Sequence, residues 1–348
     1  MTNRSPLHDA HVRLGARFVA FGGWEMPVQY EGVLTEHECV RSGVGVFDVS
    51  HLGRFQFSGG GATEVLREQL CNDVASIAPG RAQYTMALNE EGGVEDDIIV
   101  LRLGEDDYWV LPNGANYDEI VARFHDRRGV EAISRREDSV MLAVQGPDAP
   151  ELLGRVLGHA PGRFRVEDDE FRGTPIIVSG TGYTGERGAE VIASSDVGEE
   201  LLDALLQEGA GPCGLGSRDT LRLEMGYPLW GQDLDKATSP LEADLGWVVN
   251  WDHDFVGKSA LENQRDNGVA KLLVGFTTEG RRFARHGYPA RADESMGVVA
   301  SGNFSPTLGH GIGLAYLEPP PSSEASLEVE IRGEWHAATR ADPPFVTH

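Results

Sequence analysis

The chain has 348 residues, of which 40% are hydrophobic and 24% are charged, a composition typical of globular proteins with a sizeable core. Asp and Glu number 55 against 30 Lys and Arg, which gives a net charge of −25 at pH 7. Such an acidic surface repels nucleic acid and anionic lipid, and no apolar stretch reaches the roughly 20 residues of a membrane span. We therefore expect no nucleic-acid partner and no membrane association. The N-terminus also lacks an apolar leader, which predicts a cytoplasmic protein.

Lysine is scarce, since only Lys236, Lys258 and Lys271 occur. An acid-rich and lysine-poor composition fits adaptation to a salt-rich cytoplasm, although a coding bias with no physical role would give the same pattern.

Cysteine and histidine give no sign of a metal site. Cys39, Cys71 and Cys213 are widely spaced and form neither a CxxC motif nor a metal-ligand pattern. The histidines are scattered without ligand spacing. We expect no metal, and we expect each cysteine to be a small, reduced core residue.

Hydrophobic periodicity and turn residues predict strands and helices through the first 225 residues. Residues 13–30 are expected to form one short strand followed by a turn-rich segment. Strands are then expected at 82–87, 94–103, 107–112 and 140–145, with two more within 174–193 joined by a glycine-rich turn. Helices are expected at 62–72, 116–127 and 196–208, and Ser217 is expected to cap a further helix reaching Met225.

The character of the chain changes after residue 251. Residues 271–348 contain short apolar runs separated by Gly, Pro, Asn and Asp. Closely spaced short strands are typical of a small β-barrel or sandwich. We place the boundary of this domain near residue 265.

Two adjacent aspartates, Asp96 and Asp97, follow the glycine pair Gly92–Gly93 and precede the apolar run Ile98–Val100. Carboxylates in a mostly buried strand are uncommon unless they are paired or put to use. Side chains alternate along a strand, so only one of the two is expected to face a given site. A solvated edge strand explains this segment equally well on local grounds.

A second candidate group lies further along the chain. Residues 181–190 read TGYTGERGAE, where three glycines would let the backbone approach a ligand and Glu190 could accept hydrogen bonds from an amino-heterocycle. A tight hairpin with a surface glutamate is the alternative. Arg218 could bind a carboxylate or pair with Glu190, or it could simply be solvated.

Nine segments, taken in order, resemble the T-protein family of the glycine cleavage system, which are folate-dependent aminomethyltransferases. They run over nearly the whole chain: SPLHDAH (5–11), FGGWEMPVQY (21–30), RSGVGVFDVSH (41–51), NEEGGVEDDIIV (89–100), AVQGP (143–147), TGYTGERGAE (181–190), CGLGSRDTLRLEMG (213–226), TSPLEADLGW (238–247) and SGNFSPTLG (301–309).

The resemblance implies an α+β fold, a three-domain cloverleaf around a central folate-binding hole with a C-terminal all-β barrel domain. A discontinuous folate-binding domain would take residues 1–50 and 140–265. The second domain would take 51–139, and the barrel 266–348.

The resemblance also implies the reaction. A lipoylated partner, the H-protein, would present an aminomethyl group on its dihydrolipoyl sulfur. Tetrahydrofolate, as co-substrate, would take the carbon as 5,10-methylenetetrahydrofolate, and ammonia would leave. No metal would be needed.

The resemblance also implies roles for individual residues, by their positions in the matching segments. Asp97 matches the catalytic acid, with Asp96 as the alternative, and Glu190 and Arg218 match folate-binding positions. The expected cofactor-binding set is completed by Tyr84, Asn113, Tyr183 and Trp230. Trp230 departs from the tyrosine usual in the family, and the chain ends before a tyrosine that some members use to contact folate.

Two other functions share this fold. One is a stand-alone tetrahydrofolate-dependent demethylase. The other is a non-catalytic folate-binding protein, whose Lys-Gly-Cys-Tyr motif does not occur here, because Cys213 lies in Pro-Cys-Gly-Leu.

Overall fold

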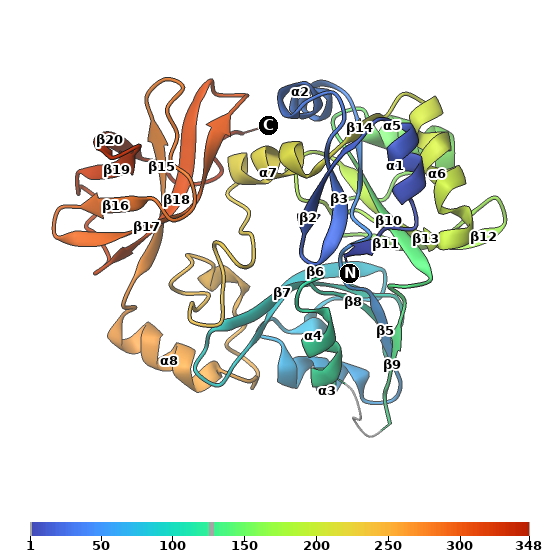
Figure 1. The fold of residues 1–348 in the computed structure, drawn as a ribbon. Helices are drawn as coiled ribbons and strands as arrows, with labels where there is room; N and C mark the ends of the chain where they lie inside the picture. Colours follow the sequence, from blue (N-terminus) through green and yellow to red (C-terminus); the bar gives the residue numbers. More distant parts are fainter. Residues whose placement is uncertain (1, 125–128, 348) are drawn as a thin grey trace. The chain divides into compact units, whose positions relative to one another are not determined.

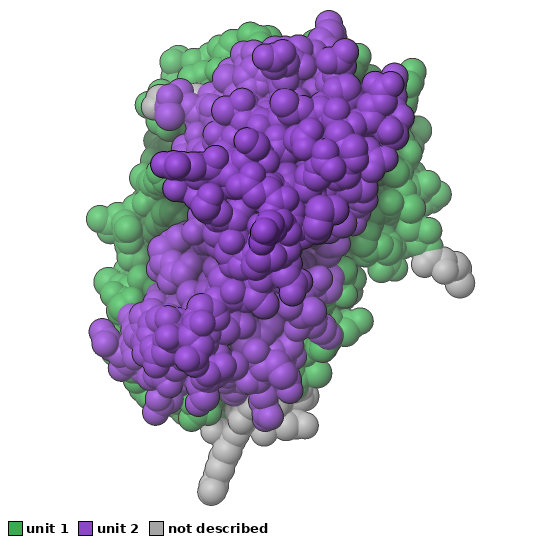
Figure 2. Space-filling view, turned by 90° about the vertical axis from the view of Figure 1, so that its left-hand side faces the viewer, with its two compact units in different colours: residues 1–68, 73–85, 97–219 green, residues 69–72, 86–96, 220–348 purple. Residues whose placement is uncertain are grey.

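The computed structural model describes residues 2–124 and 129–347, and its chain divides into two compact units. Unit 1 comprises residues 1–68, 73–85 and 97–219, and unit 2 comprises 69–72, 86–96 and 220–348 (Figure 2). Among the described residues, no helix has the length and apolar character needed to cross a lipid bilayer.

A six-stranded sheet forms the centre of unit 1 (Figure 1). In sheet order its strands are β11 (Val166–Phe171), β12 (Thr174–Ser179), β13 (Gly188–Ser194), β10 (Ser139–Gln145), β4 (Gly45–Asp48) and β14 (Gly211–Cys213). All seven residues of β10 are buried, as expected for a central strand that is covered on both faces. Helices α5 (Ala149–Leu157) and α6 (Ser195–Gln207) pack on this sheet, and their apolar side chains belong to the same hydrophobic core cluster as those of the strands. The predicted strands at 140–145 and within 174–193 and the helix at 196–208 are confirmed.

The N-terminal segment of unit 1 corrects one prediction. Residues 13–30 form a hairpin of β2 (Arg17–Phe21) and β3 (Trp24–Gln29), where we expected only one strand. Gly22 and Gly23 make the turn with φ angles of 54° and 83°, which glycine adopts without strain. β1 (Asn3–Arg4) completes a three-stranded sheet, and helices α1 (His8–Arg13) and α2 (Val33–Ser42) precede and follow the hairpin.

The second large sheet has five strands in the order β6, β7, β8, β5, β9. Their bounds are β6 (Arg81–Leu88), β7 (Val94–Arg102), β8 (Asp107–Leu111), β5 (Phe55–Ser58) and β9 (Glu131–Ser134). The sheet is accompanied by helices α3 (Ala62–Gln69) and α4 (Tyr117–Phe124). The predicted strands and helices are confirmed here, although residues 125–127 of the predicted helix lie outside the described residues. β7 lies between β6 and β8, so the alternative of a solvated edge strand is wrong.

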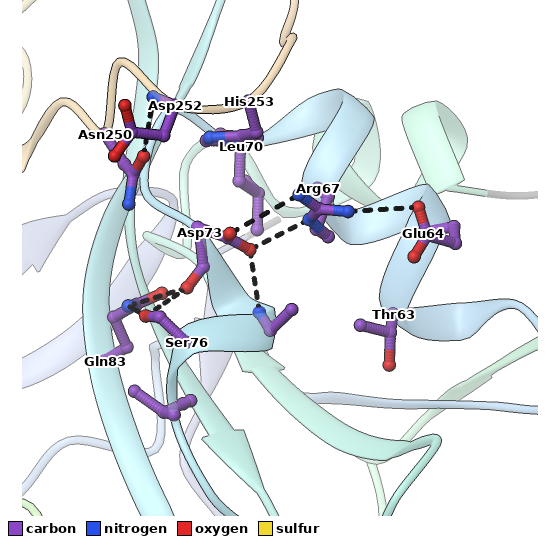
Figure 3. A network of polar contacts seen from close by, with 12 residues as sticks. Thr63, Glu64, Arg67, Leu70, Asp73, Ser76, Gln83, Asn250, Asp252 and His253 are labelled. Atoms are coloured by element: carbon purple, nitrogen blue, oxygen red, sulfur yellow. Dashed lines mark hydrogen bonds and ion pairs between the residues drawn. The ribbon is translucent and has the colours of Figure 1, made fainter.

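A polar network around Asp73 fixes the start of β6 (Figure 3). Arg67 Nε donates to Asp73 Oδ1 at 2.9 Å, and the same oxygen caps the short helix η1 (Val74–Ser76) by accepting from Ala75 N at 2.9 Å. Gln83 Nε2 donates to the backbone oxygen of Asp73 at 3.2 Å. Gln83 precedes Tyr84 on β6, so this network holds the strand segment that carries a predicted site residue.

Helix α7 (Leu215–Glu224) corrects a second prediction. The helix begins two residues before Ser217, so Ser217 is not its cap. The Ser217 hydroxyl instead donates to Gly214 O at 2.9 Å and to Glu36 Oε2 at 3.3 Å. Glu36, a buried residue of α2, also accepts from Gly214 N at 2.8 Å, so a carboxylate from a distant helix takes the capping role.

The C-terminal part of unit 2 is a closed six-stranded antiparallel barrel (Figure 1). Around the barrel the strands are β15 (Leu272–Thr278), β18 (His310–Glu318), β17 (Ser295–Ser305), β16 (Pro289–Ala292), β19 (Leu327–Ile331) and β20 (Glu334–Arg340). Unit 2 also contains η2 (Gly246–Val248) and α8 (Lys258–Asn267). The α+β class and the C-terminal barrel are thereby confirmed, and the three-domain division stays a prediction.

Candidate functional site

The Asp97 carboxylate is held by two side chains from neighbouring parts of unit 1. The Tyr84 hydroxyl on β6 donates to Asp97 Oδ2 at 3.1 Å. Asn113, just after β8, donates its amide to Asp97 Oδ1 at 2.8 Å. Two donors, one on each oxygen, fix the plane of the carboxylate. The structure therefore brings together three residues that we expected in the site.

The two aspartates of β7 lie in different environments. Burial alternates along the strand, so that Asp96 is 0% exposed and Asp97 is partly exposed. This matches the expected alternation of faces and leaves Asp97 as the more accessible carboxylate.

Arg218, Tyr183 and Glu190 form the second group of predicted residues. The Arg218 guanidinium stacks over the Tyr183 ring with Cζ 4.7 Å from the centroid. Burial lowers the pKa of Arg218, and the negative charge of Glu190 opposes that shift. Arg218 Nη1 is buried and has no hydrogen-bond partner among residues 2–124 and 129–347, which are the residues that the structure describes. This nitrogen is therefore shielded from solvent although the residue is partly exposed, and a buried donor without a partner suits an acceptor group on a ligand.

Glu190 lies on β13, opposite Ala143 of β10, and is 6% exposed. Thr181 donates its hydroxyl to Glu190 Oε2. The alternative of a surface glutamate is therefore wrong. No ion pair joins Glu190 to Arg218 among the described residues, so the direct pairing that we considered from the sequence is not observed.

The loop that carries Tyr183 is fixed from inside unit 1. Gln145 Nε2 donates to Thr181 O at 3.2 Å, and Gln145 Oε1 accepts from the Thr184 hydroxyl at 2.8 Å. Arg41 Nη1 donates to Thr184 O at 2.7 Å. A Cβ on Gly182 would lie 2.0 Å from Gln145 Oε1, so a side chain at this position would displace the glutamine that holds the loop. The glycines serve this close packing, and the sequence did not predict the role of Gln145.

His51, which the sequence did not single out, packs its backbone against Gly114, the residue after Asn113, and lies in the electrostatic field of Arg218. A Cβ on Gly114 would lie 2.1 Å from His51 O, so the residue after Asn113 must be glycine. The His51 ring is buried and meets Phe21 edge-on at 5.5 Å. Burial, followed by the positive charge of Arg218, lowers the pKa of His51 to about 3, although Asp48 opposes this shift. His51 is therefore a neutral imidazole near neutral pH. Scattered histidines gave no local signal for this role.

The pKa of His51 has a consequence for stability. The pKa of about 3 in the folded protein lies below the ordinary histidine value of 6.5, so the unfolded chain takes up a proton first as the pH falls. The stabilising contribution is fully present above pH 6.5 and is lost as the pH falls from 6.5 toward 3.

Three polar side chains of unit 1, from Asp48, His11 and Tyr30, are linked in a row. Asp48 Oδ2 lies 2.9 Å from His11 Nε2, and His11 Nδ1 lies 2.9 Å from the Tyr30 hydroxyl. Burial alone would raise the pKa of Asp48, but the hydrogen bond and charge of His11, with help from serine hydroxyls, hold it at about 2. Asp48 is therefore a charged acceptor that orients this row of side chains.

Trp230, the remaining predicted residue, belongs to unit 2. Its indole Nε1 donates to Val94 O at 3.2 Å, so the ring is anchored by a backbone contact. Its part in folate binding stays a prediction.

Comparisons with known proteins agree over the full chain. The GCVT N-terminal domain matches residues 7–253, and the glycine cleavage T-protein C-terminal barrel domain matches residues 271–347. An aminomethyltransferase of Frankia alni is 45% identical over 355 residues, covering 99% of this chain and 97% of that protein. An aminomethyltransferase of Rubrobacter xylanophilus is 46% identical over 338 residues, covering 94% of this chain and 90% of that protein.

A solved structure gives the same result. The glycine cleavage system aminomethyltransferase T from Bartonella henselae superimposes with a TM-score of 0.91 at 30% identity, covering 99% of this chain and 98% of that chain. The chain therefore belongs to the glycine cleavage T-protein family of aminomethyltransferases.

Proposed function

We propose that this aminomethyltransferase takes the methylene carbon of an S-aminomethyl-dihydrolipoyl group on the H-protein and delivers it to tetrahydrofolate. Ammonia and 5,10-methylenetetrahydrofolate are the products, and the dihydrolipoyl arm returns with its carrier. The observation that carries the proposal is the Asp97 carboxylate, held by Tyr84 and Asn113 and partly accessible.

Asp97 is the proposed catalytic residue. An ionised carboxylate beside the reacting amines can orient the nucleophilic nitrogen and stabilise the positive charge that develops on the carbon in transit. Tyr84 and Asn113 then act as positioning residues, because their hydrogen bonds set the direction of the carboxylate lone pairs. Asp96 is the alternative if the accessible face of β7 differs in the working complex.

Glu190, Arg218 and Tyr183 are the proposed folate-binding residues. Glu190 can accept hydrogen bonds from the amino-heterocycle of the pterin. The buried Arg218 Nη1 without a partner fits an acceptor on the folate, and Tyr183 keeps the guanidinium in place by stacking on it. Trp230 is proposed to add an aromatic face in unit 2.

A group of arginines in unit 2 supports the proposal that the chain binds the H-protein. A hollow of the barrel domain has four arginines and two glutamates in its lining: Arg281, Arg282, Arg285, Arg332, Glu279 and Glu334. None of these four arginines makes an ion pair with any residue that the structure describes. Unpaired arginines are notable in a chain of net charge −25, and we expect an acidic face of the carrier protein to dock on them.

An ammonia-release assay tests the proposed function. Purified protein is mixed with aminomethylated lipoyl H-protein, with and without tetrahydrofolate, and ammonia is measured with time. Release that depends on tetrahydrofolate is the expected result. Saturable tetrahydrofolate binding without ammonia release would overturn the proposal in favour of a demethylase, which a screen of methylated amines would then examine.

A further inference from the structure

Two of the three cysteines lie close together, although they are far apart in the sequence. Cys39 belongs to α2 and Cys213 ends β14. Both sulfur atoms approach Gly211: a Cβ there would lie 2.5 Å from Cys39 Sγ, and Cys213 Sγ donates to Gly211 O at 3.4 Å. A Cβ on Gly45, the register partner of Gly211, would lie 2.7 Å from Cys213 Sγ. Two paired glycines therefore leave the space that the two thiols occupy.

The two thiols differ in accessibility and acidity. Cys39 is partly exposed, whereas Cys213 is 2% exposed. The hydrogen bond with Cys213 lowers the pKa of Cys39 to about 7, although burial and the carboxylates of Glu31 and Glu36 oppose the shift. The hydrogen bond with Cys39, followed by burial, raises the pKa of Cys213. Cys39 is therefore the thiol that a dissolved oxidant can reach, and about half of it is thiolate near neutral pH.

We propose that Cys39 and Cys213 form a reversible modification site, which a peroxide closes to an intramolecular disulfide and a thiol reductant reopens. The Cys39 thiolate attacks one oxygen of hydrogen peroxide, the O–O bond breaks, and Cys39 sulfenic acid and hydroxide result. The Cys213 sulfur then attacks the Cys39 sulfur. The S–O bond breaks, and the hydroxyl group leaves as water with the Cys213 proton. Two electrons pass from the two thiols to the peroxide, which is reduced to water.

The second step is favoured by the loss of the Cys39 charge. Cys213 holds its proton partly because a thiolate on Cys39 would lie beside it. Sulfenic acid is neutral, so that opposition ends once Cys39 has reacted. The sulfur atoms must then approach to about 2.05 Å, the S–S bond length.

The site lies beside the candidate folate-binding residues of unit 1. Cys213 and Arg218 border the same small hollow, together with Asp48. Glu36, one turn before Cys39 on α2, already binds Gly214 N, the residue that follows Cys213. A disulfide would add a covalent link between α2 and the segment that leads into α7.

Counting thiols after peroxide treatment tests the proposal. The reduced full-length chain is exposed to hydrogen peroxide near neutral pH, denatured and titrated with a chromogenic disulfide reagent, and its peptides are mapped without reduction. Free thiols should fall from the three of the sequence to one, Cys71, with a peptide pair joining Cys39 to Cys213. Dithiothreitol should restore all three. Three surviving thiols, or Cys39 sulfinic acid without a cross-link, would overturn the proposal.

Matched variants separate the roles of the three cysteines. Cys71→Ser removes a buried thiol of unit 2, and its disulfide should still form, leaving no free thiol. Cys213→Ser should stop at Cys39 sulfenic acid, which dimedone traps. If Cys213→Ser does not fold, the peptide map of the unaltered chain and the Cys71→Ser count still decide. The rate of thiol loss should also rise as the pH increases through about 7, and a flat profile would contradict the assignment of Cys39 as the attacking thiol.

Discussion

Replacing Asp97 by asparagine removes the charge of the proposed catalytic group and keeps its shape. In the unaltered protein the Asn113 amide donates to Oδ1 at 2.8 Å and the Tyr84 hydroxyl donates to Oδ2 at 3.1 Å. An asparagine can keep its oxygen toward Asn113 and turn its NH₂ toward Tyr84, whose hydroxyl can accept as well as donate. Both hydrogen bonds therefore survive in neutral form, and we expect Asp97→Asn to fold.

The two expected costs differ in size. A hydrogen bond to a charged group contributes about 1.5–3 kcal/mol, against about 0.5–1.5 kcal/mol for a neutral one. Two such changes, partly offset by easier desolvation of the amide, should lower the free energy of unfolding by about 1–2 kcal/mol. Loss of a positioned acid–base group lowers the turnover number by about 10²–10⁴-fold, equivalent to about 3–5 kcal/mol in the barrier.

Three measurements decide the matter: ammonia release at saturating H-protein and tetrahydrofolate, tetrahydrofolate affinity by fluorescence titration, and thermal unfolding. Asp96→Asn is the matched control, because it lies on the opposite, buried face of the same strand. We expect Asp97→Asn to lose turnover with tetrahydrofolate affinity within about threefold of the unaltered protein. Unchanged turnover in Asp97→Asn, together with its loss in a folded Asp96→Asn, would refute the reasoning and move the role to Asp96.

Three further predictions concern binding and pH. Glu190→Gln should raise the tetrahydrofolate Kd by about 10–100-fold and change the turnover number little, because one charged acceptor is lost; calorimetric titration beside steady-state kinetics checks this, and the reverse pattern would contradict a binding role. His51→Gln should make the free energy of unfolding less sensitive to acid, because at about pH 5 protonation of His51 in the unfolded chain lowers that free energy by about 2 kcal/mol. Urea unfolding between pH 7 and pH 4.5 measures the effect. Parallel pH dependence of the variant and the unaltered protein would contradict the prediction. The KM for the H-protein should rise with added salt and in the double variant Arg281→Glu/Arg282→Glu. Arg163→Glu, a change at an exposed residue of unit 1, should leave this KM unchanged. A KM that responds neither to salt nor to the double variant would show that the arginine hollow is not the docking surface.

The fold was predictable where local patterns and packing agree. The apolar run of β10 and the short strands of the barrel are confirmed, because hydrophobic periodicity reports burial directly. β3 was missed because Pro27 and the preceding glycine pair are signs of a turn. The strand tolerates the proline beside an irregularity in its register with β2. Ser217 was assigned as a cap because no local pattern shows that Glu36 serves Gly214 from another helix.

The site was predictable only in part, for the same reason. The resemblance placed Tyr84 and Asn113 among the folate-binding residues, which stays a prediction, and their hydrogen bonds to the Asp97 carboxylate were not foreseen. His51 carries no signal in the sequence, because its neutrality comes from burial and from the charge of Arg218. The approach of Cys39 to Cys213 is likewise a property of tertiary packing, which spacing along the chain cannot show.

The surroundings of the two site carboxylates explain why we assign them different tasks. Glu190 is almost fully buried and lies in the field of Arg218, so a permanent cation already acts on its charge although no ion pair joins the two described residues. A carboxylate of this kind is suited to recognition, because its interaction changes little as charge develops on a substrate. The Asp97 carboxylate accepts hydrogen bonds from an amide and a hydroxyl, which fix its direction. Because Asp97 is partly exposed on β7, its carboxylate can approach a positive charge that forms during the reaction, and that differential interaction is what accelerates a chemical step. Removing Asp97 should for this reason change turnover, whereas removing Glu190 should change affinity.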